Sequence, residues 1–431
     1  MRRLVYALSD RSQEGSLGQR LLCALSDRSR EGSLGQPLLR IALVVAAVVA
    51  ALLAGLVTAA PVAAQEKEIA TLKAVLAEGA LDQSLFSVDF LKAVPPEQLE
   101  PVVQGIKDVI GPVVAVTHEG GPTYLVETAT HQMSSDIALD TSDKIVGLFF
   151  RPPVASTATI EDILKEMAAV APHSAFLVTQ NGVPLHAKDA DLPLAVGSAF
   201  KLGVLKAIKA QIDAGGHRWD EVAELTAADI SLPSGMLQGW PVGSPLTLQT
   251  LASLMISISD NTATDALMRV VGRDAVEAAL GIAPVLTTRE LFVLKAERDL
   301  LARYLAGDLA AKRAVLDEVA RRPLPDVSKA LSPHDQGAEW YVSPTALCGL
   351  IESVADLDMV GINPGAANKK DWAKIAFKGG SEIGVLNLTT AVTAKDGTRY
   401  CVAASWNDSK AIDEAKASSA YASLLGQLAK G

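Results

Sequence analysis

The sequence predicts a mixed α/β protein, in which two folded α+β units follow an apolar leader. Three observations indicate this fold class. The 431 residues exceed one ordinary domain. Two helix-like segments and then four strand-like segments lie between residues 66 and 150, and both kinds recur after residue 156. We therefore divide the chain into residues 1–64, 65–155 and 156–431.

The leader is predicted from an uncharged run, Ile41–Ala64, which follows Arg40 and ends in small residues before Gln65. This pattern is typical of a secretory signal peptide with its cleavage site. An uncleaved anchor is the alternative, since 24 apolar residues can span a bilayer. The polar residues before the run contain a tandem repeat, which we interpret as a duplication or an upstream start. Both alternatives place the remaining chain outside the cytoplasm, periplasmic or secreted.

The unit at 65–155 is predicted to be a small α+β accessory domain. Helical spacing and short hairpin-type links between strand-like segments indicate it. We expect His118 and His131 to be ordinary strand or surface residues. The expected helices are 66–80 and 96–110, and the expected strands are 113–119, 123–130, 132–140 and 144–150.

Composition excludes several classes of function. A net charge of −10 without a basic stripe argues against nucleic-acid binding. The chain has no H-E-x-x-H, G-x-S-x-G, G-x-G-x-x-G or Walker A motif, so we expect no metal site and no cofactor. Cys348 and Cys401 lie in apolar runs and are interpreted as small core residues, with a single bridge as the alternative.

The first polar motif of the larger unit is Ser198-Ala199-Phe200-Lys201, at the start of a predicted helix over 198–212. A spacing of three places the hydroxyl and the amine on one face. A lysine packed among apolar neighbours can lose its proton and accept that of the serine. Alone, this string is more typical of a helix cap with a solvent-reaching lysine than of a catalytic pair.

The second motif is Ser259-Asp260-Asn261, where one apolar helix ends and another begins. We expect Asp260 or Asn261 to cap the new helix. In the functional interpretation, the Ser259 hydroxyl lies beside Lys201 and relays a proton to the leaving group. The Asn261 amide then holds Lys201 and the substrate.

The third motif is Lys378-Gly379-Gly380-Ser381, on the first of three predicted antiparallel strands. Two glycines allow a substrate to approach the strand closely. Lys378 offers a cation to a carboxylate, and Ser381 offers a hydroxyl and a backbone N–H.

In this order, the three motifs match the S-x-x-K, S-D-N and K-[T/G]-G signature of class A β-lactamases and penicillin-binding proteins. Residues 156–431 therefore resemble the serine β-lactamase/penicillin-recognising family. The resemblance implies a five-stranded antiparallel sheet flanked by helices, together with a helical lobe. It also implies an acyl-enzyme on Ser198, whose oxyanion is held by the backbone N–H groups of Ser198 and Ser381.

The accessory unit resembles one branch of this family, which carries a cystatin-, isomerase- or NTF2-like domain ahead of the catalytic one. The β-lactamase-like protein of the clavulanic-acid gene cluster belongs to that branch. One departure concerns the E-x-x-L-N string, whose glutamate activates the deacylating water in class A enzymes. The chain lacks this string, and Glu290, the nearest candidate, fits a capping box with Thr287.

Three hypotheses for function follow. The first is an exported serine hydrolase acting on a β-lactam or a related amide or ester. The second is a D,D-peptidase or esterase that uses the same residues. The third is a penicillin-binding sensor that is acylated once. The expected partner is a small-molecule substrate, with membrane contact only through residues 41–64 if these are not cleaved.

Overall fold

The N-terminal unit is a four-stranded antiparallel sheet, ordered β1-β2-β3-β4, with the short β5 paired to β3. In this computed structural model, residues 62–330 and 337–430 are described. The four predicted strands are confirmed, and the first predicted helix lies earlier than expected. The elements are α3 Val62–Val75, η2 Gln83–Leu85, α4 Val88–Ala93, α5 Pro96–Ile110, β1 Val113–Gly120, β2 Thr123–Thr128, β3 His131–Leu139, β4 Ile145–Phe150 and β5 Val154–Ala155.

Helix α5 packs along this sheet because its apolar residues recur on one face. Its buried side chains are Leu99, Val103, Ile106 and Ile110, and Pro96 stands at the first helical position, where a missing N–H costs nothing. His118 and His131 lie in β1 and β3, as expected of ordinary strand residues.

The predicted leader lies almost wholly outside the described residues. Its last residues, from Val62, form the start of α3. Within 62–330 and 337–430, no helix combines the length and apolar character needed to cross a membrane.

The larger unit contains the five-stranded antiparallel sheet that the family resemblance implies, in the order β12-β13-β14-β6-β7. Strand β12, which carries the third motif, is therefore an edge strand. The sheet strands are β6 His173–Gln180, β7 Val183–Lys188, β12 Lys374–Glu382, β13 Val385–Thr393 and β14 Arg399–Asn407.

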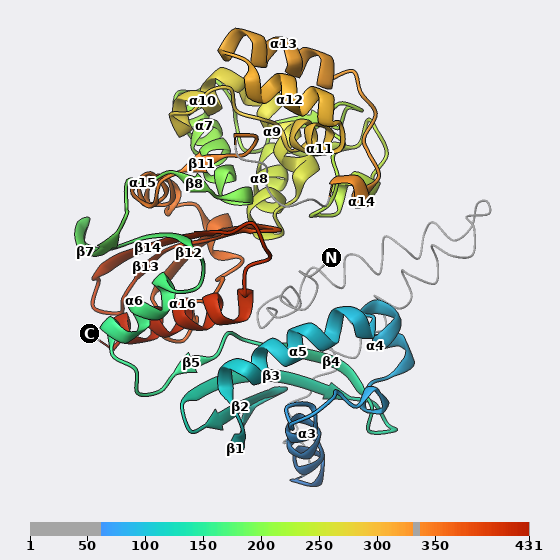
Figure 1. The fold of residues 1–431 in the computed structure, drawn as a ribbon, viewed down its shortest axis with the longest axis vertical. Helices are drawn as coiled ribbons and strands as arrows, with labels where there is room; N and C mark the ends of the chain where they lie inside the picture. The colour runs from blue at the N-terminus through green and yellow to red at the C-terminus, as the bar shows by residue number, and fades with distance from the viewer. Residues whose placement is uncertain (1–61, 331–336, 431) are drawn as a thin grey trace.

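Helices cover both faces of this sheet (Figure 1). On one face α6 and α16 pack through a core that includes Ile163, Tyr421 and Trp406. On the other face lie α15 and the helical lobe, which share a second core. These helices are α6 Ile160–Ala168, α7 Lys201–Asp213, α8 Leu248–Ser257, α9 Asn261–Val271, α10 Arg273–Leu280, α11 Thr288–Ala296, α12 Arg298–Ala306, α13 Leu309–Val319, α14 Val327–Ala330, α15 Pro344–Val354 and α16 Glu414–Leu428.

Short elements join the lobe to the sheet. Strand β8 pairs with β11, and β9 pairs with β10. Their bounds are β8 Leu194–Ala195, η3 Gly197–Phe200, β9 Val222–Glu224, η4 Leu237–Gly239, β10 Pro245–Thr247, β11 Tyr341–Val342 and η5 Asp358–Gly361.

The two units meet on the face of the sheet that carries α16. The Ala155 N–H donates to Ser423 Oγ at 2.7 Å. Helix α5 lies against α16 so closely that a Cβ on Gly105 would stand 3.3 Å from that of Ala415. The accessory unit is therefore attached on the side of the sheet opposite the helical lobe (Figure 1).

The expectation for the cysteines needs a correction. Cys348 on α15 and Cys401 on β14 are buried, as predicted, but they are joined in a disulfide, which we had treated as the alternative. Sequence position alone did not reveal the pair, because 53 residues separate the two cysteines and only the packing of α15 on β14 brings them together.

Candidate active site

The turn that carries Ser198 is a 3-10 turn, η3, which leads directly into α7 at Lys201. The predicted α-helical first turn is therefore tighter than expected. In a 3-10 turn, side chains three residues apart eclipse one another. Ser198 and Lys201 consequently lie on the same edge. Ser198 is partly exposed, whereas Lys201 is completely buried.

Strand β12 lies directly against this turn. A Cβ added to Gly380 would stand 2.0 Å from the Val196 carbonyl oxygen and 2.5 Å from the Ser198 nitrogen. A Cβ on Gly197 would stand 3.3 Å from the Ser381 nitrogen. The glycine at position 380 is thus required by the close approach of two backbones of this chain, whereas the sequence had predicted a close approach by the substrate.

The Lys201 amine connects the first motif to the second. Its Nζ donates to the Ser259 carbonyl oxygen at 2.7 Å, to Ser259 Oγ at 3.1 Å and to Asn261 Oδ1 at 2.6 Å. The predicted contact between the Asn261 amide and Lys201 is therefore confirmed.

The Ser259 hydroxyl connects the second motif to the third. Lys378 Nζ donates to Ser259 Oγ at 3.1 Å, the same distance as Lys201 Nζ. All three side chains are nearly inaccessible to solvent, with Ser259 4% and Lys378 2% exposed. One hydroxyl oxygen therefore lies between two buried amines, which is the geometry of a proton relay.

Ser259 has an unusual backbone conformation, with φ at +58°. Left-handed backbone is disfavoured for residues other than glycine and persists only where neighbours enforce it. Asp260 supplies this constraint, as its predicted capping role requires. Its carboxylate accepts the N–H groups of Ala263, Met236 and Leu237 at 2.6–2.9 Å.

The sequence analysis missed a loop that supports this corner. The Ser234 hydroxyl donates to the Ser259 carbonyl oxygen at 2.8 Å, and the Leu232 carbonyl accepts the Asn261 amide at 2.9 Å. A Cβ on Gly235, whose φ is +104°, would stand 2.3 Å from Asp260 Cγ. The stretch that begins at Ser231 resembles the approach to the S-D-N motif in class A-type enzymes, but the resemblance gave Ser234 and Gly235 no role of their own.

Glu290 lies in the capping box that the sequence predicted. Thr287 Oγ1 accepts the Glu290 N–H at 3.1 Å, and the Glu290 carboxylate accepts the Thr287 N–H at 2.8 Å. The same carboxylate forms an ion pair with Arg273 at 2.6 Å. Its hydrogen-bonding capacity is therefore used at the start of α11.

Asp265 links the second motif's helix to α11. Its carboxylate accepts the N–H groups of Thr288 and Arg289 and the Thr288 hydroxyl, all at 2.8–2.9 Å. Burial raises the pKa of Asp265 to about 7 in spite of these hydrogen bonds. Asp265 thus positions α11 beside the motif residues.

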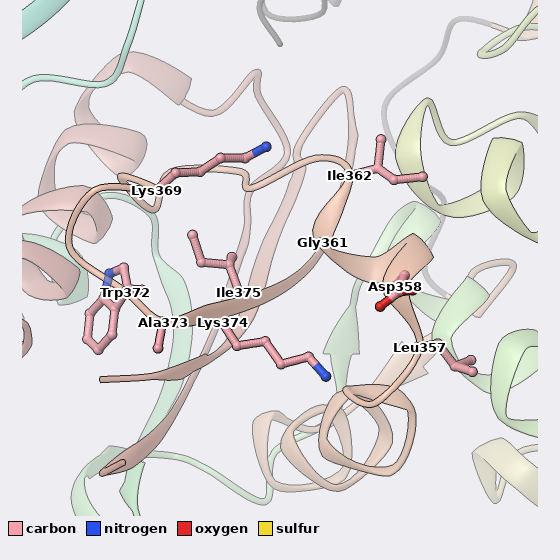
Figure 2. A pocket seen from close by; sticks show the side chains of 9 residues that line it. All are labelled: Leu357, Asp358, Gly361, Ile362, Lys369, Trp372, Ala373, Lys374 and Ile375. Atoms are coloured by element: carbon pink, nitrogen blue, oxygen red, sulfur yellow. The ribbon is translucent and has the colours of Figure 1, made fainter. Parts of the chain in front are cut away.

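A hollow of about 460 Å³ lies at the other end of β12. Figure 2 shows it along Lys374 and Ile375, facing the segment from Leu357 to Ile362. None of the motif residues lines it. Within 62–330 and 337–430, no three histidine, cysteine or acidic residues are grouped to hold a metal ion.

One family model matches part of this chain. Residues 156–335 match the model of the family described as the β-lactamase enzyme family. No curated protein matches the chain.

Several solved structures are similar to this chain. A β-lactamase from Sphaerobacter thermophilus is 21% identical and matches over 64% of this chain and 98% of its own, with a TM-score of 0.46. The protein PBP-A is 19% identical over 62% of this chain and 95% of its own, with a TM-score of 0.43. An ancestral class A β-lactamase is 16% identical over 63% of this chain and 100% of its own, with a TM-score of 0.45.

Proposed function

We propose that this chain, whose residues 156–335 belong to the β-lactamase enzyme family, is a serine hydrolase that forms an acyl-enzyme on Ser198. The observation that carries the proposal is the Ser259 hydroxyl, 3.1 Å from both Lys201 Nζ and Lys378 Nζ. Lys201 and Ser198 lie on the same edge of the η3 turn. The nucleophile Ser198, the base Lys201 and the proton relay Ser259 are therefore neighbours in that order. The substrate class is a β-lactam or a related amide or ester.

In the first half of the reaction, Ser198 Oγ attacks the substrate's carbonyl carbon. Lys201 acts as the base that takes the hydroxyl proton. The proton then passes through Ser259 to the leaving nitrogen or oxygen, as its bond to the carbonyl carbon breaks. The N–H groups of Ser198 and Ser381 stabilise the oxyanion, since Gly380 brings β12 against the Ser198 turn.

Substrate positioning is assigned to the third motif and to Asn261. Lys378 is a buried cation and attracts a substrate carboxylate. The Ser381 hydroxyl contacts the same group, and Gly380 leaves room for the substrate to lie along the β12 edge. Asn261 holds Lys201 through its amide oxygen.

Intact-mass spectrometry of the purified full chain with penicillin and a chromogenic cephalosporin tests the proposal. We expect the mass to increase by one acyl group, and Ser198→Ala to abolish both this adduct and any turnover. Ser409→Ala, on the exposed surface, is the matched control and should behave as wild type. Turnover or an adduct that survives in Ser198→Ala would overturn the mechanism.

The same experiment separates the three substrate hypotheses. Release of the adduct with cephalosporin turnover supports a β-lactam hydrolase. Cleavage of D-Ala-D-Ala peptides or simple esters with β-lactams left intact supports a peptidase or esterase. A stable adduct of one equivalent supports a penicillin-binding sensor.

An extracytoplasmic location is part of this proposal. The Cys348–Cys401 disulfide supports it, because such bonds persist in oxidising compartments. Cell fractionation with thiol alkylation checks it. We expect the chain outside the cytoplasm with both cysteines protected, and a cytoplasmic, alkylated chain would contradict it.

A further inference from the structure

Two buried ionisable side chains and a partly exposed one lie together near the Ser198 turn, and the proposed reaction leaves them without a role. Lys295 on α11 pairs with Glu339 Oε1 at 3.3 Å and forms a close ion pair with Glu382 Oε2. The side chains of Lys295, Glu339 and Glu382 are 1%, 0% and 20% exposed. We call these three residues the acid–lysine cluster.

The acid–lysine cluster contains one cation and two carboxyl groups. Burial raises the pKa of Glu339 well above its ordinary range, and the neighbouring carboxyl of Glu382 raises it further. Two carboxylates this close cannot both ionise readily. Glu339 is therefore a carboxyl that ionises with difficulty, and Lys295 lies within ion-pair distance of both carboxyl groups.

The alternation of β12 places Glu382 on the reaction side of the strand. Side chains two residues apart share one face of a strand. Lys378 reaches Ser259 from that face, and Gly380 meets the Ser198 backbone on it. Glu382 follows on the same face, about 7 Å along from Gly380.

Glu339 is connected to the Ser198 turn through its neighbour in the chain. The next residue, Trp340, stacks on Phe200 with ring centroids 3.9 Å apart. Its carbonyl oxygen accepts the Val196 N–H at 3.0 Å. Both carboxyl groups of the cluster are therefore held by backbone that also shapes the Ser198 turn.

The other acids around this turn are committed to backbone groups. Asp260 and Glu290 cap helices, and Asp265 accepts three hydrogen bonds at the start of α11. By contrast, the carboxyl groups of Glu339 and Glu382 meet each other and Lys295 rather than backbone N–H groups. The cluster is therefore not used to cap a helix.

We propose that Glu382, held by Lys295 and Glu339, activates the water that hydrolyses the acyl-enzyme. This inference rests on the proposed function. The Glu382 carboxylate takes a proton from water as the water oxygen bonds to the acyl carbon. The bond from that carbon to Ser198 Oγ then breaks, and the proton returns to Oγ. The reaction consumes one water and releases a carboxylic acid.

The experiment measures acylation and deacylation separately in the full chain, by intact mass after mixing with penicillin and removal of its excess. Glu382→Gln keeps the side-chain shape and removes the base. We expect it to form the Ser198 adduct at a rate close to wild type, and to lose that adduct about 100-fold more slowly. Glu290→Gln is the matched control, because Glu290 caps α11, and its adduct lifetime should equal that of wild type.

Glu382→Asp distinguishes a base from a structural side chain. It keeps a carboxylate, so we expect deacylation faster than in Glu382→Gln and a rate that still rises with pH. Equal adduct lifetimes in wild type and Glu382→Gln would overturn the inference, as would equally slow deacylation in the Gln and Asp variants. A wild-type chain that never gains an adduct would overturn the proposed function and, with it, this inference.

Discussion

Two sets of carboxylates surround the Ser198 turn, and they differ in what they accept. Asp260 and Glu290 each accept backbone N–H groups at the start of a helix. Glu339 and Glu382 meet another carboxyl and a single lysine.

The two sets of carboxylates are therefore suited to different tasks, the first to holding backbone in place and the second to proton transfer. A carboxylate that accepts backbone N–H groups at the start of a helix fixes the chain around it. A carboxyl beside another carboxyl keeps a proton that can be moved. The first set therefore fixes local backbone, Asp260 beside Ser259 and Glu290 at the start of α11, and the second is suited to exchange protons.

The largest effect is expected from Asp260→Ala. The variant leaves three N–H groups without their acceptor and releases the constraint on Ser259. We expect a loss of about 4 kcal/mol in the free energy of unfolding and loss of the penicillin adduct. Urea denaturation measures the stability, and intact mass measures the adduct. Asp260→Asn retains one carboxyl oxygen, so we expect its stability and adduct yield to lie between those of wild type and Asp260→Ala. If Asp260→Ala formed the penicillin adduct as wild type does, the conformation of Ser259 would not depend on Asp260.

Glu290→Gln should separate stability from chemistry. It weakens the capping box and breaks the pair with Arg273, which is partly exposed. We expect the free energy of unfolding to fall by about 2 kcal/mol. Urea denaturation measures this loss, while adduct formation and lifetime should stay as in wild type. A changed adduct lifetime would show that Glu290, like the second set of carboxylates, takes part in proton transfer.

Glu339→Gln should change how stability depends on pH. The folded-state pKa of Glu339 is raised by burial and by Glu382, with Lys295 the cation that opposes this shift. Between its ordinary pKa, about 4.3, and the raised value, the folded state binds more protons than the unfolded state. Stability from this group is therefore complete at low pH and decreases as pH rises. Because Gln cannot ionise, we expect wild type to lose more stability than the variant between pH 5 and 8. Urea denaturation at several pH values measures this, and an equal change in the free energy of unfolding with pH in both proteins would contradict it.

The smallest effect is expected from Asp220→Ala. Asp220 pairs with Arg218 at 2.6 Å, but both side chains are mostly exposed. Exposed ion pairs contribute little because water screens them. The unfolding midpoint and the adduct lifetime should both match wild type. A measurable shift in either would mean that a short ion pair matters here without burial.

Local patterns predicted much of the fold and site. Helical spacing located α5, short links located β1 to β4, and the strand-like segments that begin with the third motif located β12 to β14, whereas β6 and β7 were implied only by the family resemblance. The Thr287–Glu290 capping box was readable because its residues are three apart. Motif order identified Ser198, Lys201 and Ser259 through family resemblance, but it did not place them in space.

By itself, then, the sequence determined the order of its elements, the capping residues and the three motifs, since each depends on neighbours within a few residues. Only the tertiary structure decided that Lys201 and Lys378 converge on one hydroxyl. It also decided that Cys348 pairs with Cys401 and that Glu339 shares Lys295 with Glu382. These contacts join segments 43 or more residues apart, and burial, which depends on packing of the whole chain, sets which charges must share a proton.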